Sequence, residues 1–207
     1  MDGTPGAPAM AGALASGVVT VLGAILTGGM STRMGQDKAD VLVGAHTMLE
    51  LVGGAVRSVA DHSILLGPDR QGWECWPDSV HAHGPLAGMA TALERTDHDH
   101  VLLVAVDQPF IRRDTLRRIT EGAASIPVVP VDAHGVPQVT CAVYPKGIGD
   151  EAAGEASSGG SIQSLLDRVS FQPVAPHEWG SWGEDGRSWY SVDDQDALKE
   201  GMERFQT

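Results

Sequence analysis

The glycine-rich segment at residues 26–38 contains residue types that bind phosphate. Its sequence, LTGGMSTRMGQDK, combines three glycines with hydroxyl side chains, an arginine and a lysine. Gly28 and Gly29 can adopt φ values closed to other residues, so consecutive N–H groups can point at phosphate oxygens. Lys38 adds a positive charge. Because the apolar run at residues 18–26 reads as a buried strand, this segment is expected to be a phosphate-binding loop at the end of that strand.

The spacing in this loop excludes two common nucleotide sites. Lys38 follows Asp37, so the G-x-x-x-x-G-K-[ST] pattern of P-loop proteins is absent, and the dinucleotide pattern G-x-G-x-x-G is absent too. Glycine-rich turns also follow strands in α/β proteins that bind no nucleotide. The loop alone therefore does not identify a function.

Asp107 is the second candidate for chemistry. It follows residues 101–106, the most continuously apolar run in the chain, which predicts a central parallel strand covered on both faces. Ligands of open α/β sheets bind beyond the carboxyl ends of the strands. Asp107 and the glycine-rich loop are thus expected at one edge, where Asp107 could hold Mg²⁺. Taken by itself, the aspartate could equally be a turn or cap residue.

Predicted helices and strands alternate along the rest of the chain. Apolar residues at i, i+3, i+4 spacing indicate helices, and short apolar runs between turn residues indicate strands. Further strands are expected at residues 63–66, 126–131 and 138–144, and helices at residues 48–59, at 85–93, at 114–122 with Asp114 as N-cap, after a Ser161 cap, and after an Asp194 cap with Met202 facing inward. This order predicts a single α/β domain with a mainly parallel sheet and helices on both faces.

Four segments are interpreted from composition. Residues 151–160 are expected to form a flexible loop, and residues 73–77 either a strand or a loop. The tryptophans of residues 179–189 either line a pocket or, more commonly, cover core edges. Residues 1–17 are rich in Gly, Ala and Pro and contain no Lys or Arg, which predicts a disordered extension rather than a secretory signal and leaves residues 18–207 as the domain.

Charge and cysteine content restrict the partners and the compartment. A net charge of −13 disfavours a nucleic acid or an anionic membrane as partner. No apolar run approaches the ~20 residues that a membrane span requires. Cys75 and Cys141 have no C-x-x-C partner, which favours reduced thiols in a cytoplasmic protein. His81 and His83 lack a third ligand at recognisable spacing, so solvated histidines are favoured over a metal site.

Three motifs resemble those of the molybdenum cofactor guanylyltransferases. Residues 26–38 follow that family's pattern L-A-G-G-x-S-x-R-M-G-x-D-K, with Thr27 in place of the usual alanine. Residues 84–88 read GPLAG, and Pro85 suits the first turn of a helix. Residues 107–110 read DQPF, which resembles the family's metal-binding D-x-P-[FY]. The resemblance extends from about residue 18 to residue 198.

This resemblance implies a reaction, a fold and a set of site residues. The reaction is transfer of GMP from MgGTP to the molybdopterin cofactor with release of pyrophosphate, on a Rossmann-like fold of the nucleotide-diphospho-sugar transferase type. Lys38, Arg33 and Asp107 would be catalytic, and Asp107 would bind Mg²⁺, with Asp193 as a candidate second ligand. Nucleotide contacts, including the backbone amides of residues 27–29, are implied for Leu26, Thr27, Gly28, Gly29, Lys38, Asp78, Gly84 and Asp107. Transient contact with molybdoenzymes or their chaperones is also implied.

Departures from the family pattern leave two alternatives open. Leu66, Gly67 and Pro68 stand where the family has a nucleotide-contacting asparagine, and Gly160 replaces a common arginine. One alternative is a cytidylyltransferase or another small-phosphate nucleotidyltransferase of the same fold. The other is a non-catalytic chaperone that binds nucleotide or cofactor. The GPLAG motif favours guanine over cytidine, and the presence of Lys38 together with Asp107 favours catalysis.

Overall fold

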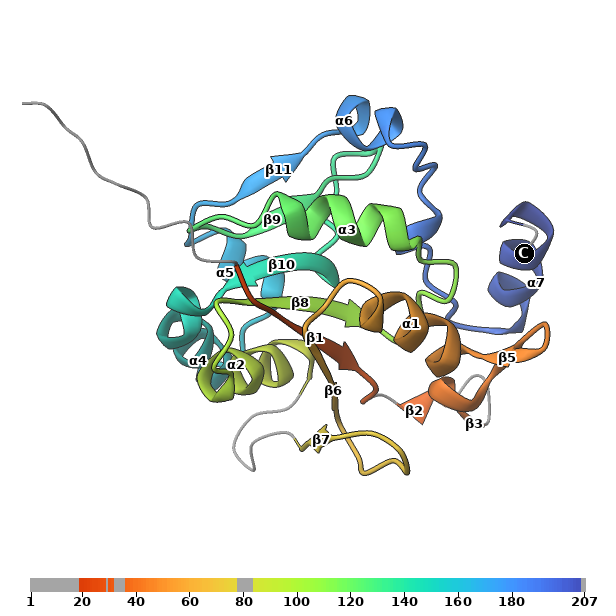
Figure 1. Cartoon of the computed structure of the whole chain (residues 1–207), viewed down its shortest axis with the longest axis horizontal. Helices are drawn as coiled ribbons and strands as arrows, with labels where there is room; N and C mark the ends of the chain where they lie inside the picture. The colour runs from red at the N-terminus through yellow and green to blue at the C-terminus, as the bar shows by residue number, and fades with distance from the viewer. Residues whose placement is uncertain (1–18, 29, 32–35, 78–83, 206–207) are drawn as a thin grey trace, which may run out of the picture.

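The computed structural model describes residues 19–28, 30–31, 36–77 and 84–205. Their centre is a seven-stranded sheet with the strand order β11-β9-β10-β8-β1-β6-β7 (Figure 1). The strands are β1 (Val21–Leu26), β6 (His62–Leu66), β7 (Cys75–Trp76), β8 (His100–Ala105), β9 (Val128–Pro130), β10 (Cys141–Pro145) and β11 (Gln172–Val174). Neighbouring strands are parallel except at β10, which is antiparallel to both β8 and β9. The expected mainly parallel α/β sheet is confirmed.

Helices cover both faces of this sheet (Figure 1). The helices on one face are α1 (Met48–Arg57) and α3 (Arg113–Glu121), and those on the other are α2 (Pro85–Arg95), α4 (Gly149–Ser157) and α5 (Ile162–Leu166). Helix α7 (Gln195–Phe205) lies apart from the sheet at the periphery (Figure 1) and contributes Leu198 and Phe205 to the core under α1 and α3. The smaller elements are the hairpins β2 (Met30–Ser31) with β3 (Gln36–Asp37) and β4 (Leu42–Val43) with β5 (His46–Thr47), the helix α6 (Pro176–Ser181), and the 3₁₀ turns η1 (Lys38–Asp40), η2 (Lys146–Ile148) and η3 (Arg187–Trp189). None of the helices in the described ranges is long and apolar enough to cross a membrane.

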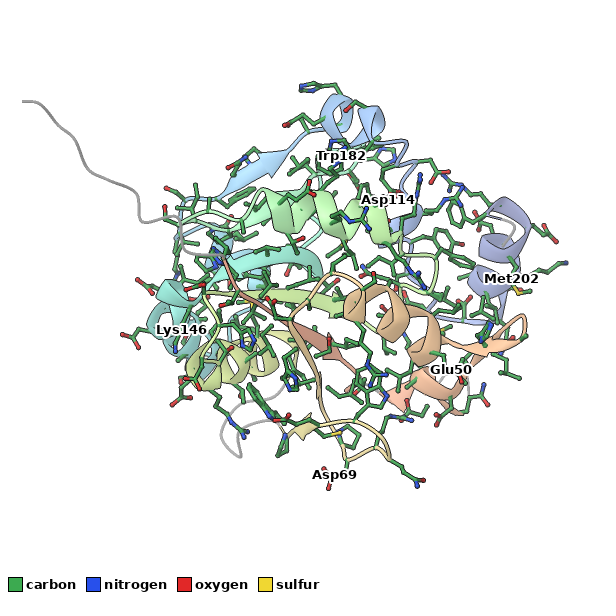
Figure 2. The ribbon with its side chains drawn as sticks, viewed as in Figure 1. Glu50, Asp69, Asp114, Lys146, Trp182 and Met202 are labelled. Atoms are coloured by element: carbon green, nitrogen blue, oxygen red, sulfur yellow. The ribbon has the colours of Figure 1, made fainter. Side chains whose placement is uncertain are left out.

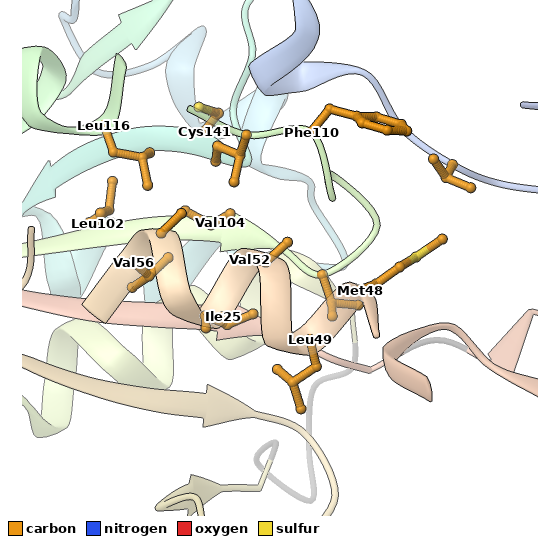
Figure 3. Packing of buried hydrophobic residues seen from close by; sticks show 14 of the residues in the cluster. Ile25, Met48, Leu49, Val52, Val56, Leu102, Val104, Phe110, Leu116 and Cys141 are labelled. Atoms are coloured by element: carbon orange, nitrogen blue, oxygen red, sulfur yellow. The ribbon is translucent and has the colours of Figure 1, made fainter. Parts of the chain in front are cut away.

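The central strands are buried on both faces, as their apolar sequences predict. In β8, Leu102 and Val104 belong to the core under α1 and α3, whereas Val101 and Leu103 belong to the core under α2 and α4. Figure 3 shows the first of these cores, with α1 lying over the sheet. Side chains of successive strand residues point to opposite faces, so one apolar run supplies both cores.

Helix α1 confirms the sequence-based prediction and has a defined start. Thr47 accepts a hydrogen bond from the Glu50 amide at 3.1 Å, and the Glu50 carboxylate accepts one from the Thr47 amide at 2.7 Å. This capping box satisfies amide groups that the first turn would otherwise leave unpaired. It fixes the helix directly after the β4–β5 hairpin.

The prediction of a flexible loop at residues 151–160 is wrong, because most of this segment forms α4. Ala152 and Glu155 are buried, and α4 lies beside α2 (Figure 1). Glu155 accepts a hydrogen bond from the Ser164 hydroxyl at 2.6 Å. Tertiary packing of this kind stabilises helices whose own composition is unfavourable, so composition alone misled the prediction.

Two predictions about single helix residues are also wrong. Asp114 is not the N-cap of α3, because Arg112 occupies that position; Asp114 lies in the first turn and pairs with Arg117 at 3.1 Å. Met202 does not face the core but is 42% exposed on α7, at the periphery of the molecule (Figure 2). The Asp194 cap is confirmed by a bond from the Ala197 amide at 2.9 Å.

Residues 73–77, the segment after Ser161 and the tryptophan-rich tail all contain helices or strands. Residues 75–76 form the edge strand β7, and Ser161 caps α5 by accepting a bond from the Ser164 amide at 3.1 Å. The tryptophan-rich tail forms α6 and η3. Trp179 donates from its indole nitrogen to the Val131 carbonyl at 2.8 Å, and the three tryptophans pack against the core. Covering of a core edge is therefore confirmed as their structural role.

Candidate active site

Three parallel strands end at the same edge of the sheet. Leu26 at the end of β1 is in register with Leu66 of β6 and with Ala105 of β8. The glycine-rich loop follows β1 and Asp107 follows β8, so both leave the sheet at this edge. The expectation that they share one side of the molecule is confirmed.

Lys38 forms ion pairs with Asp107 and with Asp193, a residue near the C-terminal end of the chain. Its ammonium lies 2.8 Å from Asp107 Oδ2 and 2.6 Å from Asp193 Oδ1. The Lys38 and Asp107 side chains are 15% and 22% exposed, whereas Asp193 is 58% exposed. The structure thus brings together three of the predicted site residues in one ion-paired cluster.

The turn that carries Lys38 is held from two sides. The Asp37 carboxylate caps η1 by accepting a hydrogen bond from the Ala39 amide at 2.9 Å. Arg70, in the loop after β6, pairs with Asp37 and with Asp40, in the latter case at 2.7 Å. Arg70 therefore braces the turn on both sides of Lys38. Sequence reasoning missed this residue because no motif or periodic spacing links position 70 to positions 37 and 40.

The two carboxylates are connected through the backbone. The Val106 amide donates to the Leu26 carbonyl at 3.0 Å, which ties the start of the Asp107 loop to β1. The Val192 amide donates to the Asp107 carbonyl at 2.8 Å. Since Val192 directly precedes Asp193, this bond places the second carboxylate next to the first.

The electrostatics of the cluster favour a charged lysine. Partial burial disfavours the ammonium, but hydrogen bonds and negative charges from Asp107 and Asp193 outweigh it, so the pKa of Lys38 is raised. Lys38 consequently carries a full positive charge at neutral pH. A cation beside two carboxylates can bind phosphate oxygens, and the carboxylates can hold a divalent cation.

The Thr27 amide does not have the predicted role of holding the nucleotide, because it is bonded within the sheet. The amide donates to the Leu66 carbonyl at 3.0 Å, and the Thr27 hydroxyl donates to the same oxygen at 3.2 Å. The Thr27 amide, expected to hold the nucleotide, therefore continues the sheet instead. Gly28 is exposed, and a Cβ added there would contact nothing within 4 Å. Room for a ligand thus begins at Gly28 and not at Thr27.

Gly67, one of the three residues that stand where the family has an asparagine, has no room for a side chain. Its φ is +144°, and a Cβ would lie 2.6 Å from the Thr27 hydroxyl oxygen. Any side chain at this position would be strained and would clash with Thr27.

The GPLAG segment begins α2 beside the strand ends. Gly84 is the N-cap with φ +97°, and Pro85 is the first helical residue, as predicted. A Cβ on Gly88 would lie 3.0 Å from Leu26 Cδ2 and 3.4 Å from Leu66 Cβ. The glycine therefore allows the first turn of α2 to pack closely against the ends of β1 and β6.

Several predicted residues lie outside the described ranges. Gly29, Arg33, Asp78, His81 and His83 belong to these, and their roles stay predictions. Over the ranges that are described, no group of three or more His, Cys, Asp or Glu side chains forms a ready set of metal ligands. The described part of the site contributes the two carboxylates of Asp107 and Asp193.

Comparisons with protein families and with curated sequences both find matches to this chain. The family described as "MobA-like NTP transferase domain" matches residues 23–173. A protein of Pelotomaculum thermopropionicum, named "Probable molybdenum cofactor guanylyltransferase", is 37% identical over 131 residues, which cover 60% of this chain and 63% of that protein. The chain thus spans somewhat less than two thirds of this curated relative.

Solved structures share the fold. Molybdopterin-guanine dinucleotide biosynthesis protein A from Archaeoglobus fulgidus superposes with a TM-score of 0.76 at 21% identity, covering 88% of this chain and 97% of that one. A Mycobacterium tuberculosis protein solved in complex with manganese gives a TM-score of 0.65 at 20% identity, covering 90% of this chain and all (100%) of the other. Identities this low establish the common fold alone.

Proposed function

The chain belongs to the MobA-like NTP transferase family, and on this premise we propose that it transfers GMP from MgGTP to the molybdopterin cofactor, releasing pyrophosphate. The matched region, residues 23–173, includes the glycine-rich loop, GPLAG and Asp107. The observation that carries the proposal is the contact of Lys38 with Asp107 and Asp193 beyond the carboxyl ends of β1 and β8. This is the position where open α/β sheets bind ligands.

The donor groups of the cluster fit Mg²⁺. This ion prefers oxygen ligands and is usually held by one or two carboxylates together with substrate phosphates and water. Asp107 and Asp193 supply two carboxylates that meet at a single ammonium. The related protein solved with manganese supports a divalent ion in this fold. We assign the Mg²⁺ ligands to Asp107 and Asp193.

The reaction requires positioning and charge neutralisation by this chain. A phosphate oxygen of the acceptor attacks the α-phosphorus of GTP, and the bond to pyrophosphate breaks, so no protein nucleophile is needed. Lys38 binds the phosphates and offsets the negative charge that builds on the leaving pyrophosphate. Bound Mg²⁺ supplies further positive charge at the phosphate oxygens. Gly28 and Gly29 offer backbone amides, and Arg33 a second cation.

Other site roles and partners are part of the same proposal. Leu26, Thr27, Asp78 and Gly84 contact the nucleotide, although Thr27 cannot do so through its amide. GTP and the molybdopterin cofactor are the substrates. We place the reaction in the cytoplasm, with transient contact between this protein and molybdoenzymes or their chaperones.

Pyrophosphate release tests the reaction. Mixing the protein with GTP, Mg²⁺ and molybdopterin cofactor should release pyrophosphate, and Lys38→Ala should lower the rate by about 10²-fold or more. Lys199→Ala, which changes an exposed lysine on α7, serves as the matched control and should keep the wild-type rate. Wild-type rates in Lys38→Ala would refute the assignment.

Nucleotide preference separates the alternatives. Thermal unfolding with GTP, CTP or ATP plus Mg²⁺ should show the largest stabilisation with GTP, because a ligand stabilises the fold according to its affinity. Greater stabilisation by CTP would indicate a cytidylyltransferase. Binding of GTP without any pyrophosphate release in the presence of acceptor would indicate the chaperone alternative.

A further inference from the structure

The tail segment at residues 183–192 contains a buried carboxylate that the proposed reaction does not use. Glu184 is only 4% exposed. Its Oε1 accepts from the backbone amides of Asp185, Gly186 and Ser188, at 3.0, 2.8 and 3.3 Å. Its Oε2 accepts from the hydroxyls of Thr115 and Ser188. One side chain therefore organises the turn that contains it, since every one of these donors lies on that turn or on α3.

These bonds fasten the tail to the start of α3. Thr115 belongs to α3, so its bond to Glu184 links two segments far apart in the sequence. Arg112 adds two more links, because its amide donates to the Ser188 hydroxyl at 3.0 Å and its guanidinium donates to the Gly183 carbonyl. The tail is thus attached to Arg112 and the first turn of α3, which directly follow the loop that contains Asp107.

From this attachment the backbone leads to the candidate active site. Phe110 and Tyr190 pack edge to face with ring centroids 6.0 Å apart. Two residues later the Val192 amide donates to the Asp107 carbonyl, and Asp193 reaches Lys38 at 2.6 Å. The Asp193 side chain is 58% exposed, and the Val192 bond next to it fixes the backbone that carries it. The contacts that hold residues 183–192 therefore contribute to the position of Asp193.

We propose that Glu184 is a positioning residue that holds residues 183–192 against α3 and thereby keeps Asp193 beside Lys38 and Asp107. The expected change in the binding of metal and nucleotide rests on the proposed function. The expected loosening of the backbone at residues 189–194 does not. Loss of Glu184 leaves three backbone amides and two hydroxyls without their acceptor. The tail then loosens, and Asp193 loses its fixed distance from Asp107.

Glu155 provides a matched control for a purely structural role. It is the other buried glutamate of the described chain, 5% exposed on α4, where it accepts from the Ser164 hydroxyl and pairs with Arg168 at 3.0 Å. It belongs to the opposite face of the sheet from α3. Glu155→Ala should therefore lower the melting temperature without changing the backbone at residues 189–194.

Amide hydrogen exchange measured without ligand is the first test. Peptides that cover residues 189–194 should exchange faster in Glu184→Ala than in the wild type, and at the wild-type rate in Glu155→Ala. Thr115→Val removes a single donor from outside the tail and should give an intermediate rate. Thr115→Val also decides the question if Glu184→Ala does not fold. Exchange at the wild-type rate in the folded Glu184 and Thr115 variants would overturn the proposal.

Binding of Mn²⁺ in the presence of GTP, followed by electron paramagnetic resonance, is the second test. Glu184→Ala should weaken Mn²⁺ binding about tenfold, as loss of supporting groups around metal ligands does. Glu184→Gln keeps an oxygen acceptor and should restore most of the affinity. In an Asp193→Ala background, Glu184→Ala should add nothing, because both changes act through the same carboxylate.

The two tests separate the positioning role from the proposed function. Additive losses in the double variant would show that Glu184 does not act through Asp193. Absence of Mn²⁺ and GTP binding in the wild type would count against the proposed function, and the exchange rates would still decide whether Glu184 holds the tail.

Discussion

Replacing Lys38 by methionine tests whether its ammonium both stabilises the fold and competes with Mg²⁺ for Asp107 and Asp193. Methionine keeps a long, flexible side chain but removes the charge that lies between Asp107 and Asp193. The protein should then lose some stability and most of its transferase activity. It should also bind Mg²⁺ more readily in the absence of nucleotide, because no ammonium competes for the two carboxylates.

The expected loss of stability follows from the exposure of each contact. A hydrogen bond between charged groups contributes about 1.5–3 kcal/mol when it is shielded from water. The bond from Lys38 to Asp107 is partly shielded, whereas Asp193 is 58% exposed and its bond is worth at most about 1 kcal/mol. Allowing for desolvation of the lysine, we expect a net loss of about 1–2 kcal/mol. For a chain of this size this lowers the melting temperature by about 2–8 °C.

Thermal unfolding with and without millimolar MgCl₂ measures both effects. Lys38→Met should melt below the wild type without salt and gain more from MgCl₂ than the wild type does, since a ligand that binds the folded state more tightly stabilises it more at the same concentration. Potassium chloride at equal ionic strength controls for screening. An unchanged melting temperature together with an equal gain from MgCl₂ would refute the view that the ammonium occupies the space between the carboxylates.

Three further outcomes are expected. Gly67→Ala should destabilise the fold by about 1–3 kcal/mol in denaturant titrations, because φ of +144° strains any other residue; an unchanged midpoint would contradict this. Burial raises the pKa of the Cys141 thiol, so maleimide or DTNB should label the partly exposed Cys75 and leave Cys141 unreacted until the protein unfolds. Hydrogen bonds from Thr20 lower the pKa of Asp99 from its ordinary 3.8, so its stabilising contribution is complete above about pH 4 and is lost as the pH falls through the lowered pKa. Asp99→Asn should therefore flatten the acid side of the curve of melting temperature against pH, and a curve identical to the wild type would contradict this linkage.

The sheet and the edge that carries the site could be predicted from the sequence. Apolar runs such as residues 101–106 are central strands because only strands covered on both faces lack polar alternation. Once β1 and β8 are parallel neighbours, the residues after them must emerge together. The approach of Asp107 to the glycine-rich loop follows from that topology alone.

The contacts that hold the site could not be predicted in the same way. Arg70 and Glu184 act through hydrogen bonds to residues distant in sequence, and neither position belongs to a periodic pattern. A glycine-rich motif does not reveal where a β-ladder ends, so the sequence predicts a nucleotide contact for the Thr27 amide, which bonds to β6 instead. Helix α4 was missed because packing against α2, and not composition, stabilises it.

The contact between Lys38 and Asp193 also has a consequence for the synthesis of the protein. These residues are 155 positions apart, and the residues of the family match end at 173, before Asp193. A ribosome at ~5–20 residues per second needs roughly 8–30 seconds to pass from one to the other. During that time the nascent chain can form β1, β6 and β8 but lacks one of its two carboxylates. Completion of the proposed metal site is thereby delayed until residue 193 has been translated.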